Sequence, residues 1–192
     1  MKKYRDRFVP GAYYHVFNRG NGSDPLFFKS KNYSYFLQQY DKYVSQLIET
    51  YAYCLLPNHF HILIRVKDDL DTDVNNVICS KFRRFFQSYA QAINKQQYRT
   101  GSLFKKNFCR VHIDKEWLLF LLVYFIHSNP LRHNISLDFF RYPYSSYEKI
   151  LNSKISKLQK QPVIKWFGSK HNYIEFHNHY RDCHQISKYI IE

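Results

Sequence analysis

Two histidines near the middle of the chain, His59 and His61, have the spacing of a metal-binding pair. They open an apolar segment that follows another apolar segment, with Pro57 and Asn58 between the two. This pattern predicts two β-strands joined by a tight turn. Because side chains alternate along a strand, both imidazoles should point to one face of the sheet and Phe60 to the other. Two neighbouring imidazoles supply part of the ligand set of a divalent cation.

A His-x-His pair by itself is a weak motif for a metal site. The remaining cysteines and histidines give still weaker evidence for one. The four cysteines, at positions 54, 79, 109 and 183, form no Cys-x-x-Cys pair, so they do not predict a zinc finger. Free thiols in a reducing cytoplasm are the simplest interpretation. His15 is expected either in the core or behind the metal ligands. Four histidines fit no standard ligand spacing and are interpreted as surface residues: His171, His177, His179 and His184.

The charge balance of the 192-residue chain is strongly basic. Lys and Arg number 29 against 15 Asp and Glu, which gives a formal net charge of +14. Such a charge repels itself in a compact fold unless a polyanion shares it. Aromatic residues make up 19% of the chain, and aromatic rings can stack on unpaired bases while cations hold the phosphates. The composition therefore favours a nucleic-acid partner, with an anionic membrane as the second choice.

Six basic residues are the predicted nucleic-acid contacts. Arg19 stands in a Gly/Asn-rich segment, and Arg99 begins a turn with Gly101 whose backbone amides suit phosphate oxygens. A solvated helix face or an ordinary loop explains such charges about equally well. The complete set is Arg19, Arg83, Arg84, Arg99, Lys105 and Arg132.

Hydrophobic periodicity predicts alternating strands and helices that position these residues. We expect strands at 11–17 and 108–113 and the hairpin at 51–66. Helices are expected from Ser30, as N-cap, to about residue 49, at 74–97 and at 115–129. Asp114 should cap the last helix and Pro130 should end it. This order indicates an α+β fold in which helices pack on a central antiparallel sheet. We expect residues 1–151 to form the main domain and 152–192 a basic C-terminal extension with short helices.

Targeting and membrane signals are not expected in this chain. The N-terminal residues lack an apolar signal core, and no run of about 18 apolar residues could span a bilayer. We therefore expect a cytoplasmic protein that does not contact a membrane.

Five segments, in order, resemble the single-tyrosine transposases of the HUH class, a name that stands for His-hydrophobe-His. The similarity is greatest to the REP-associated tyrosine transposases and related insertion-sequence transposases. The segments are YYHVFNRGNGSDPLFF, YAYCLLPNHFHILI, RTGSLF, YFIHSNPLRHN and YPYSSYEKIL, and together they cover about residues 10–151.

The resemblance implies a ferredoxin-like nuclease domain and a reaction on single-stranded or hairpin DNA. It implies that His59 and His61, with Asn129 as a third contact, hold Mg²⁺ or Mn²⁺. A tyrosine would then attack a phosphodiester, forming a 5′-phosphotyrosine link and freeing a 3′-OH. Relatives include both dimers and monomers, so a homodimer is one expectation. His127 matches a histidine of the same segment and is expected to be structural.

One position departs from the family pattern. The family's nucleophile lies four residues before the Asn of the Asn-Pro pair, and here that residue is Phe125, which has no oxygen. Tyr124 is the nearest tyrosine, about 100° round the helix. It is the candidate catalytic residue if the helix register shifts, and a core tyrosine otherwise. The leading hypothesis is a metal-dependent DNA transposase, and the alternative is a catalytically degenerate or domesticated hairpin-DNA-binding protein. A protein acting on RNA is a third, weaker option.

Overall fold

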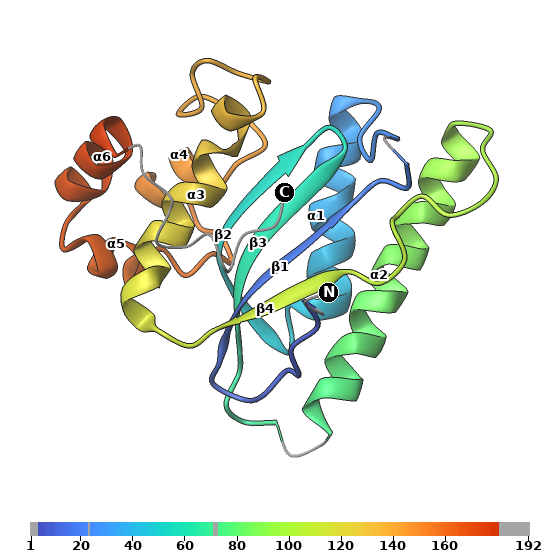
Figure 1. Ribbon diagram of the computed structural model, residues 1–192, viewed down its shortest axis with the longest axis horizontal. Coiled ribbons are helices and arrows are strands. Elements are labelled where there is room, and N and C mark those ends of the chain that lie inside the picture. The colour runs from blue at the N-terminus through green and yellow to red at the C-terminus, as the bar shows by residue number, and fades with distance from the viewer. Residues whose placement is uncertain (1–3, 23, 71–72, 181–192) are drawn as a thin grey trace.

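The computed structural model describes residues 4–22, 24–70 and 73–180. It has three layers, with a four-stranded sheet between two helices on one face and a group of helices on the other (Figure 1). The elements through β4 follow one another as strand, helix, strand, strand, helix, strand. This is the ferredoxin-like order, so the expected α+β class and the predicted ferredoxin-like domain are confirmed.

The sheet is antiparallel throughout and has the order β2-β3-β1-β4. Its strands are β1 (Tyr13–Arg19), β2 (Ile48–Leu56), β3 (His59–Val66) and β4 (Cys109–Ile113). The predicted hairpin is therefore present, with its two-residue turn between β2 and β3. This turn places the start of β3 beside the end of β1, at one end of the sheet.

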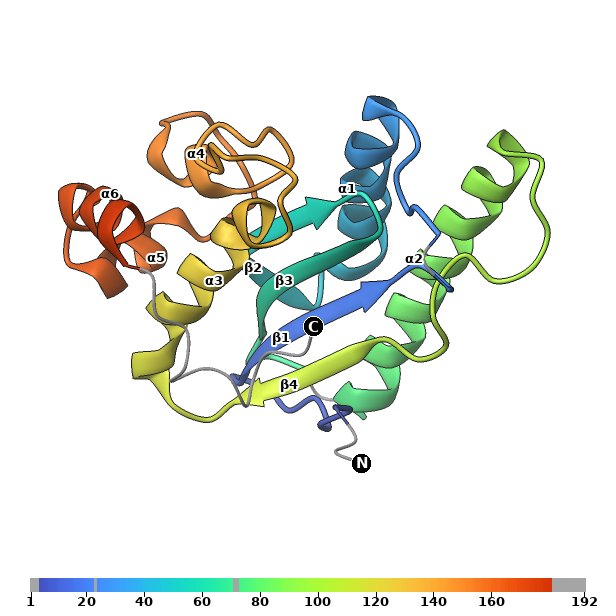
Figure 2. The same cartoon turned by 45° about the horizontal axis from the view of Figure 1, so that its top comes forward.

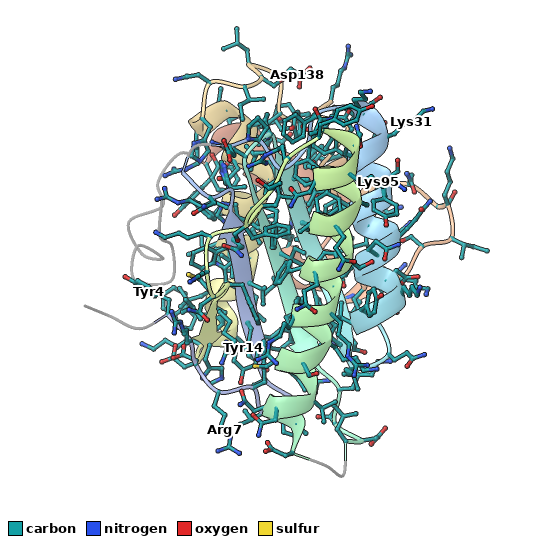
Figure 3. The ribbon with its side chains drawn as sticks, turned by 90° about the vertical axis from the view of Figure 1, so that its right-hand side faces the viewer. Tyr4, Arg7, Tyr14, Lys31, Lys95 and Asp138 are labelled. Carbon is teal, nitrogen blue, oxygen red and sulfur yellow. The ribbon has the colours of Figure 1, made fainter. Side chains whose placement is uncertain are left out.

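Two long helices cover one face of the sheet. Helix α1 (Ser30–Val44) and helix α2 (Val74–Gln96) lie side by side, as Figure 3 shows. Lys31 and Lys95 mark the same end of the pair, and Arg7 lies near the start of α2. Helix α2 forms because its buried residues recur at helical spacing and pack on the sheet. These residues are Val74, Ile78, Phe82, Phe85, Tyr89 and Ile93.

The start of α1 differs from the sequence prediction. The N-cap is Lys29, and Ser30 is already the first helical residue. The amide oxygen of Asn32 accepts hydrogen bonds from the backbone N–H groups of Phe28 and Lys29. An N-cap residue lies outside the helical geometry, which Ser30 already has, so Ser30 is not the cap.

Helix α3 (Leu119–Arg132) packs on the opposite face of the sheet, and Figure 2 shows it crossing beside β2 and β3. A 3₁₀ turn at Glu116–Leu118 precedes it, so Asp114 is not its cap. The prediction that Pro130 ends the helix was also wrong, because α3 continues to Arg132. A proline near the helix end removes only one N–H, and the next turn still closes through the bond from the His133 N–H to the Asn129 carbonyl.

The C-terminal part adds three short helices beside α3. They are α4 (Tyr147–Leu151), α5 (Lys160–Phe167) and α6 (Lys170–His179). Side chains from α3 and from these helices form one apolar core with the strand residues on that face, among them Phe17 and Leu63. Among the described residues, Cys54, Cys79 and Cys109 are free thiols, and Cys183 lies outside them. No described helix is both long enough and apolar enough to span a membrane.

Candidate metal centre and nucleic-acid interface

The hairpin places His59 and His61 on the face of the sheet that α3 covers. In the strand register, His59 lies opposite Arg19 of β1, and His61 lies opposite Phe17. Phe60 packs in the core on the other face, under α1 and α2. The predicted alternation is thus confirmed, and the two imidazoles share a face with ring centroids 5.2 Å apart.

Each histidine is oriented by a hydrogen bond at its Nδ1 atom. His59 Nδ1 lies 2.7 Å from Asn58 Oδ1, and His61 Nδ1 lies 2.9 Å from His15 Nε2. An amide oxygen only accepts, so Nδ1 of His59 carries the proton and its Nε2 holds the lone pair. The Nε2 atoms of both histidines are buried, and neither has a hydrogen-bond partner among the described residues. These are the atoms that a metal ion would bind.

The protein environment keeps both imidazoles neutral at physiological pH. Burial lowers the pKa of His59 to about 4, with further contributions from His133 and Arg19. Burial also lowers the pKa of His61 well below its usual value, and His15 and His59 add to the effect. A neutral imidazole has the lone pair that coordination requires.

Asn129 on α3 presents a third unpartnered atom. Its Nδ2 donates to the Phe125 carbonyl over 2.8 Å, while its buried Oδ1 has no partner among the described residues. An amide oxygen is a suitable ligand for Mg²⁺ or Mn²⁺. In the described part of the chain, no set of three His, Cys, Asp or Glu side chains could hold a metal. The candidate ligands of a divalent cation therefore stay the imidazoles of His59 and His61 and, as the resemblance implies, the amide of Asn129.

Phe125 occupies the side of α3 that faces the histidines. Its ring centroid lies 5.6 Å from that of His61 and 6.0 Å from that of His15. The Arg132 guanidinium lies over the same ring at 5.1 Å. The position where the family has its nucleophile is thus beside the candidate metal ligands, but it carries a hydrocarbon ring.

Tyr124, the predicted catalytic residue, lies on another side of α3. Its ring packs edge-on against Phe176 and Tyr180, 5.8 and 5.1 Å away, and its hydroxyl donates to the Tyr180 carbonyl. It is only 3% exposed. The structure therefore does not bring Tyr124 to His59 and His61, because one residue along a helix turns the side chain by about 100°.

A buried polar network ties the C-terminal helices to α3. His127 Nδ1 lies 3.1 Å from His177 Nε2, and His127 Nε2 lies 2.8 Å from the Ser146 hydroxyl. The structural role expected for His127 fits this placement. The interpretation of His177 as a surface residue was wrong, since it is fully buried. His171 and His179 are exposed, and His184 lies outside the described residues.

The six predicted nucleic-acid contacts are spread over several surfaces. Arg19, Arg83, Arg84, Lys105 and Arg132 are exposed, whereas Arg99 is paired with Asp24. Two of them lie near the histidines: the charge of Arg19 contributes to the low pKa of His59, and that of Arg132 to the low pKa of His61. Arg99 stabilises the loop conformation, so it has less freedom to bind a phosphate.

Sequence reasoning missed the role of Asn58. It treated this residue as part of the turn, but its side chain selects the tautomer of His59. The signal was present, since a polar side chain directly before a candidate ligand can orient that ligand.

Comparison with known proteins yields two informative matches, although no family model matches the chain. A curated protein of Haemophilus influenzae, assigned to the REP-associated tyrosine transposases, is 26% identical over 111 residues. The chain is thus similar in sequence to a REP-associated tyrosine transposase. The match covers 56% of this chain and 63% of the Haemophilus protein, so the chain spans less than two thirds of that relative's length.

A solved structure of a REP-associated tyrosine transposase bound to a REP hairpin shares the fold. The TM-score is 0.63 at 18% identity, and the match covers 79% of this chain and 86% of the other. The resemblance drawn from the five sequence segments is therefore confirmed, together with the fold that it implied.

Proposed function

We propose that this chain is a DNA transposase of the REP-associated type that acts on single-stranded or hairpin DNA. The observation that carries this proposal is that three candidate ligand atoms are buried and have no hydrogen-bond partner among the described residues: Nε2 of His59, Nε2 of His61 and Oδ1 of Asn129. Leaving such atoms unpaired costs about 1–3 kcal/mol each, a cost that a bound cation would remove. The net charge of +14 supports a polyanionic partner.

In this proposal His59, His61 and Asn129 hold Mg²⁺ or Mn²⁺, which would polarise the scissile phosphate as a Lewis acid. The protein's own residues then position the DNA. Arg19, which lies opposite His59 at the end of β1, would bind a phosphate oxygen of the same DNA strand. A tyrosine oxygen would bond to phosphorus while the bond from phosphorus to the 3′ oxygen breaks, leaving a 5′-phosphotyrosine and a 3′-OH.

A second candidate function is favoured by one specific observation. Phe125 faces His61, and Tyr124 binds the Tyr180 carbonyl on another side of α3. Attack by Tyr124 would require α3 to turn by about 100°. If it does not turn, the chain is a hairpin-DNA-binding protein that has lost its nucleophile.

Incubation with a labelled DNA hairpin and Mn²⁺ distinguishes the two candidates. A transposase that uses Tyr124 forms a covalent protein–DNA adduct that disappears in Tyr124→Phe and in His59→Ala. Hairpin binding without an adduct in the wild type supports the second candidate instead. A wild type that binds no hairpin contradicts both.

Location and assembly stay predictions in this proposal. An activity on DNA agrees with the expected cytoplasmic location, and sedimentation velocity with and without hairpin DNA would test for the expected homodimer.

A further inference from the structure

Part of the connection between β1 and α1 holds the turn between β2 and β3, beside which it passes in Figure 2. This part comprises residues 20–22 and 24–27, and we call it the turn clamp. Three of its backbone N–H groups donate to the two carbonyls of the turn. These bonds run from Gly20 to Asn58 over 2.8 Å, and from Leu26 and Phe27 to Pro57 over 2.7 and 3.1 Å. The backbone of the turn is therefore fixed from outside its own hairpin.

Through the turn, the clamp acts on a candidate metal ligand. The carbonyl of Asn58 accepts from Gly20, and the side chain of the same Asn58 lies 2.7 Å from His59 Nδ1. A hydrogen bond weakens steeply once its geometry departs from the preferred distance and angle. A shift of the Asn58 backbone would therefore release His59 Nδ1 and let the proton move to Nε2, the atom that a metal ion would bind.

Gly20 is the position where the clamp bends back on itself. A Cβ atom there would collide with the Asp24 carbonyl oxygen, so only glycine fits. The bend is closed by the Asp24 N–H, which donates to the Asn21 carbonyl over 3.2 Å. The Asn21 N–H in turn donates to the Leu103 carbonyl over 2.9 Å, which ties the clamp to the segment after α2.

An ion pair and a buried hydrogen bond anchor the clamp to α2 and the segment that follows it. Arg99 Nη2 donates to Asp24 Oδ2, and Asp24 is the only charged residue of the clamp. The Arg99 side chain is only 23% exposed, so water screens this pair less than it screens a fully exposed one. The Tyr89 hydroxyl donates to the Leu26 carbonyl over 2.7 Å. The position of the clamp thus depends on contacts that lie far along the chain from the hairpin.

We infer that Asp24 is a positioning residue for the proposed metal site. Its pairing with Arg99 holds the clamp against the turn, and the clamp keeps the Asn58 side chain on His59 Nδ1. This inference rests on the proposed function for the identity of the site and adds a residue that acts on the site only through the turn. A pair that merely stabilised the fold would leave the tautomer of His59 unchanged.

The first test reads the tautomer of His59 in the metal-free protein at pH 7, by long-range ¹H–¹⁵N NMR correlations of the imidazole ring. The ring is neutral there, because burial lowers its pKa to about 4. In the wild type, Nδ1 should carry the proton. Asn58→Ala is the reference variant in which the form protonated at Nε2 should appear, and Asp24→Asn should populate that form in part.

The second test measures the Kd of Mn²⁺ by isothermal titration calorimetry. Asp24→Asn should raise it by roughly 2–30-fold, the range of effects that a packed network transmits between sites. Arg99→Gln should have a similar effect. The double variant should bind Mn²⁺ no more weakly than the weaker of the two single variants, because both changes break the same pair.

Asp41→Asn is the matched control. Asp41 pairs with Lys157 over 2.7 Å, and its side chain is 40% exposed, against 47% for Asp24. It lies near the end of α1, which precedes the start of β2, whereas the turn follows the other end of β2. This variant loses an ion pair of the same kind and should keep the wild-type tautomer and the wild-type Kd of Mn²⁺.

Two results would overturn the inference and leave the proposed function intact. The first is an Asp24→Asn variant with the wild-type tautomer and the wild-type Kd of Mn²⁺. The second is an equal loss in Asp24→Asn and Asp41→Asn, since the effect would then follow from lower stability. A wild type that binds no Mn²⁺ would instead overturn the metal site of the proposed function, and the tautomer of His59 would still decide whether Asp24 positions that ring.

Discussion

His15 Nε2 and His61 Nδ1 lie 2.9 Å apart, and both rings are buried between β1 and β3 on one side and α3 on the other. The rings are nearly parallel, with an interplanar angle of 21°. If the proton sits on His61 Nδ1, His61 donates to His15 and its Nε2 is left with the lone pair. His15 is then a positioning residue that holds His61 in the tautomer that binds a metal.

We expect His15→Phe to weaken Mn²⁺ binding by about 10–100-fold, the usual cost of removing such an outer partner. Isothermal titration of the purified protein with Mn²⁺ measures this change. His171→Ala, which removes an exposed histidine, is the control and should bind Mn²⁺ as the wild type does. Equal affinity in His15→Phe and wild type would show that His15 only fills space.

Phe125→Tyr should place a hydroxyl beside the candidate metal ligands. The Phe125 ring centroid is 5.6 Å from that of His61, so a para oxygen extends from the correct side of α3. We expect this variant to form a Mn²⁺-dependent covalent adduct with hairpin DNA, stronger than any adduct of the wild type. The adduct should be lost when His61→Ala is added. A variant that binds the hairpin normally but forms no adduct would refute the placement of Phe125 at the reaction site.

Tyr124→Phe should lower the free energy of unfolding by about 1 kcal/mol, because it removes the hydrogen bond to the Tyr180 carbonyl and keeps the ring. Urea denaturation followed by circular dichroism measures this. Tyr43→Phe, at a partly exposed position of α1, is the comparison and should have a smaller effect. A Tyr124→Phe variant as stable as the wild type would mean that this bond contributes little.

Stability should fall in mild acid because of the buried His177. Burial lowers its pKa to about 3, against about 6.5 for the unfolded chain. Between these values the unfolded state binds a proton that the folded state does not, so the free energy of unfolding decreases as pH falls from about 6.5 towards 3. One such group contributes a slope of up to about 1.4 kcal/mol per pH unit.

The measurement is urea denaturation of wild type and His177→Gln at pH 7, 6, 5 and 4. The variant should be less stable at pH 7 but should lose less stability on acidification. The same slope in both proteins would exclude His177 as a source of the acid sensitivity.

Binding to hairpin DNA should weaken steeply with salt, because a chain of net charge +14 releases counterions from the phosphates it contacts. With about six phosphate contacts, the affinity should drop on the order of a thousandfold between 50 and 200 mM salt. Anisotropy titrations at several salt concentrations give the slope. Arg83→Gln should reduce it by about one contact, and a slope near zero in the wild type would rule out phosphate-led binding.

The amino-acid sequence by itself determined the local features on which the site depends. Because side chains alternate along a strand, the imidazoles of His59 and His61 lie on one face of the sheet and Phe60 on the other. The helical spacing of apolar residues such as Ile78 and Phe82 gives α2 an apolar face that packs on the sheet. These outcomes follow from strand and helix periods, which act over a few residues. The excess of positive charge is likewise a property of composition.

Only the tertiary structure decided which long-range neighbours meet. The side of α3 that faces the histidines depends on how the whole helix packs, and this brings Phe125 rather than Tyr124 to His61. The burial of His177, 50 residues after His127, needed α6 to dock on α3. Such contacts join residues far apart in the chain, and their geometry is set by the packing of complete elements, which no short sequence window contains.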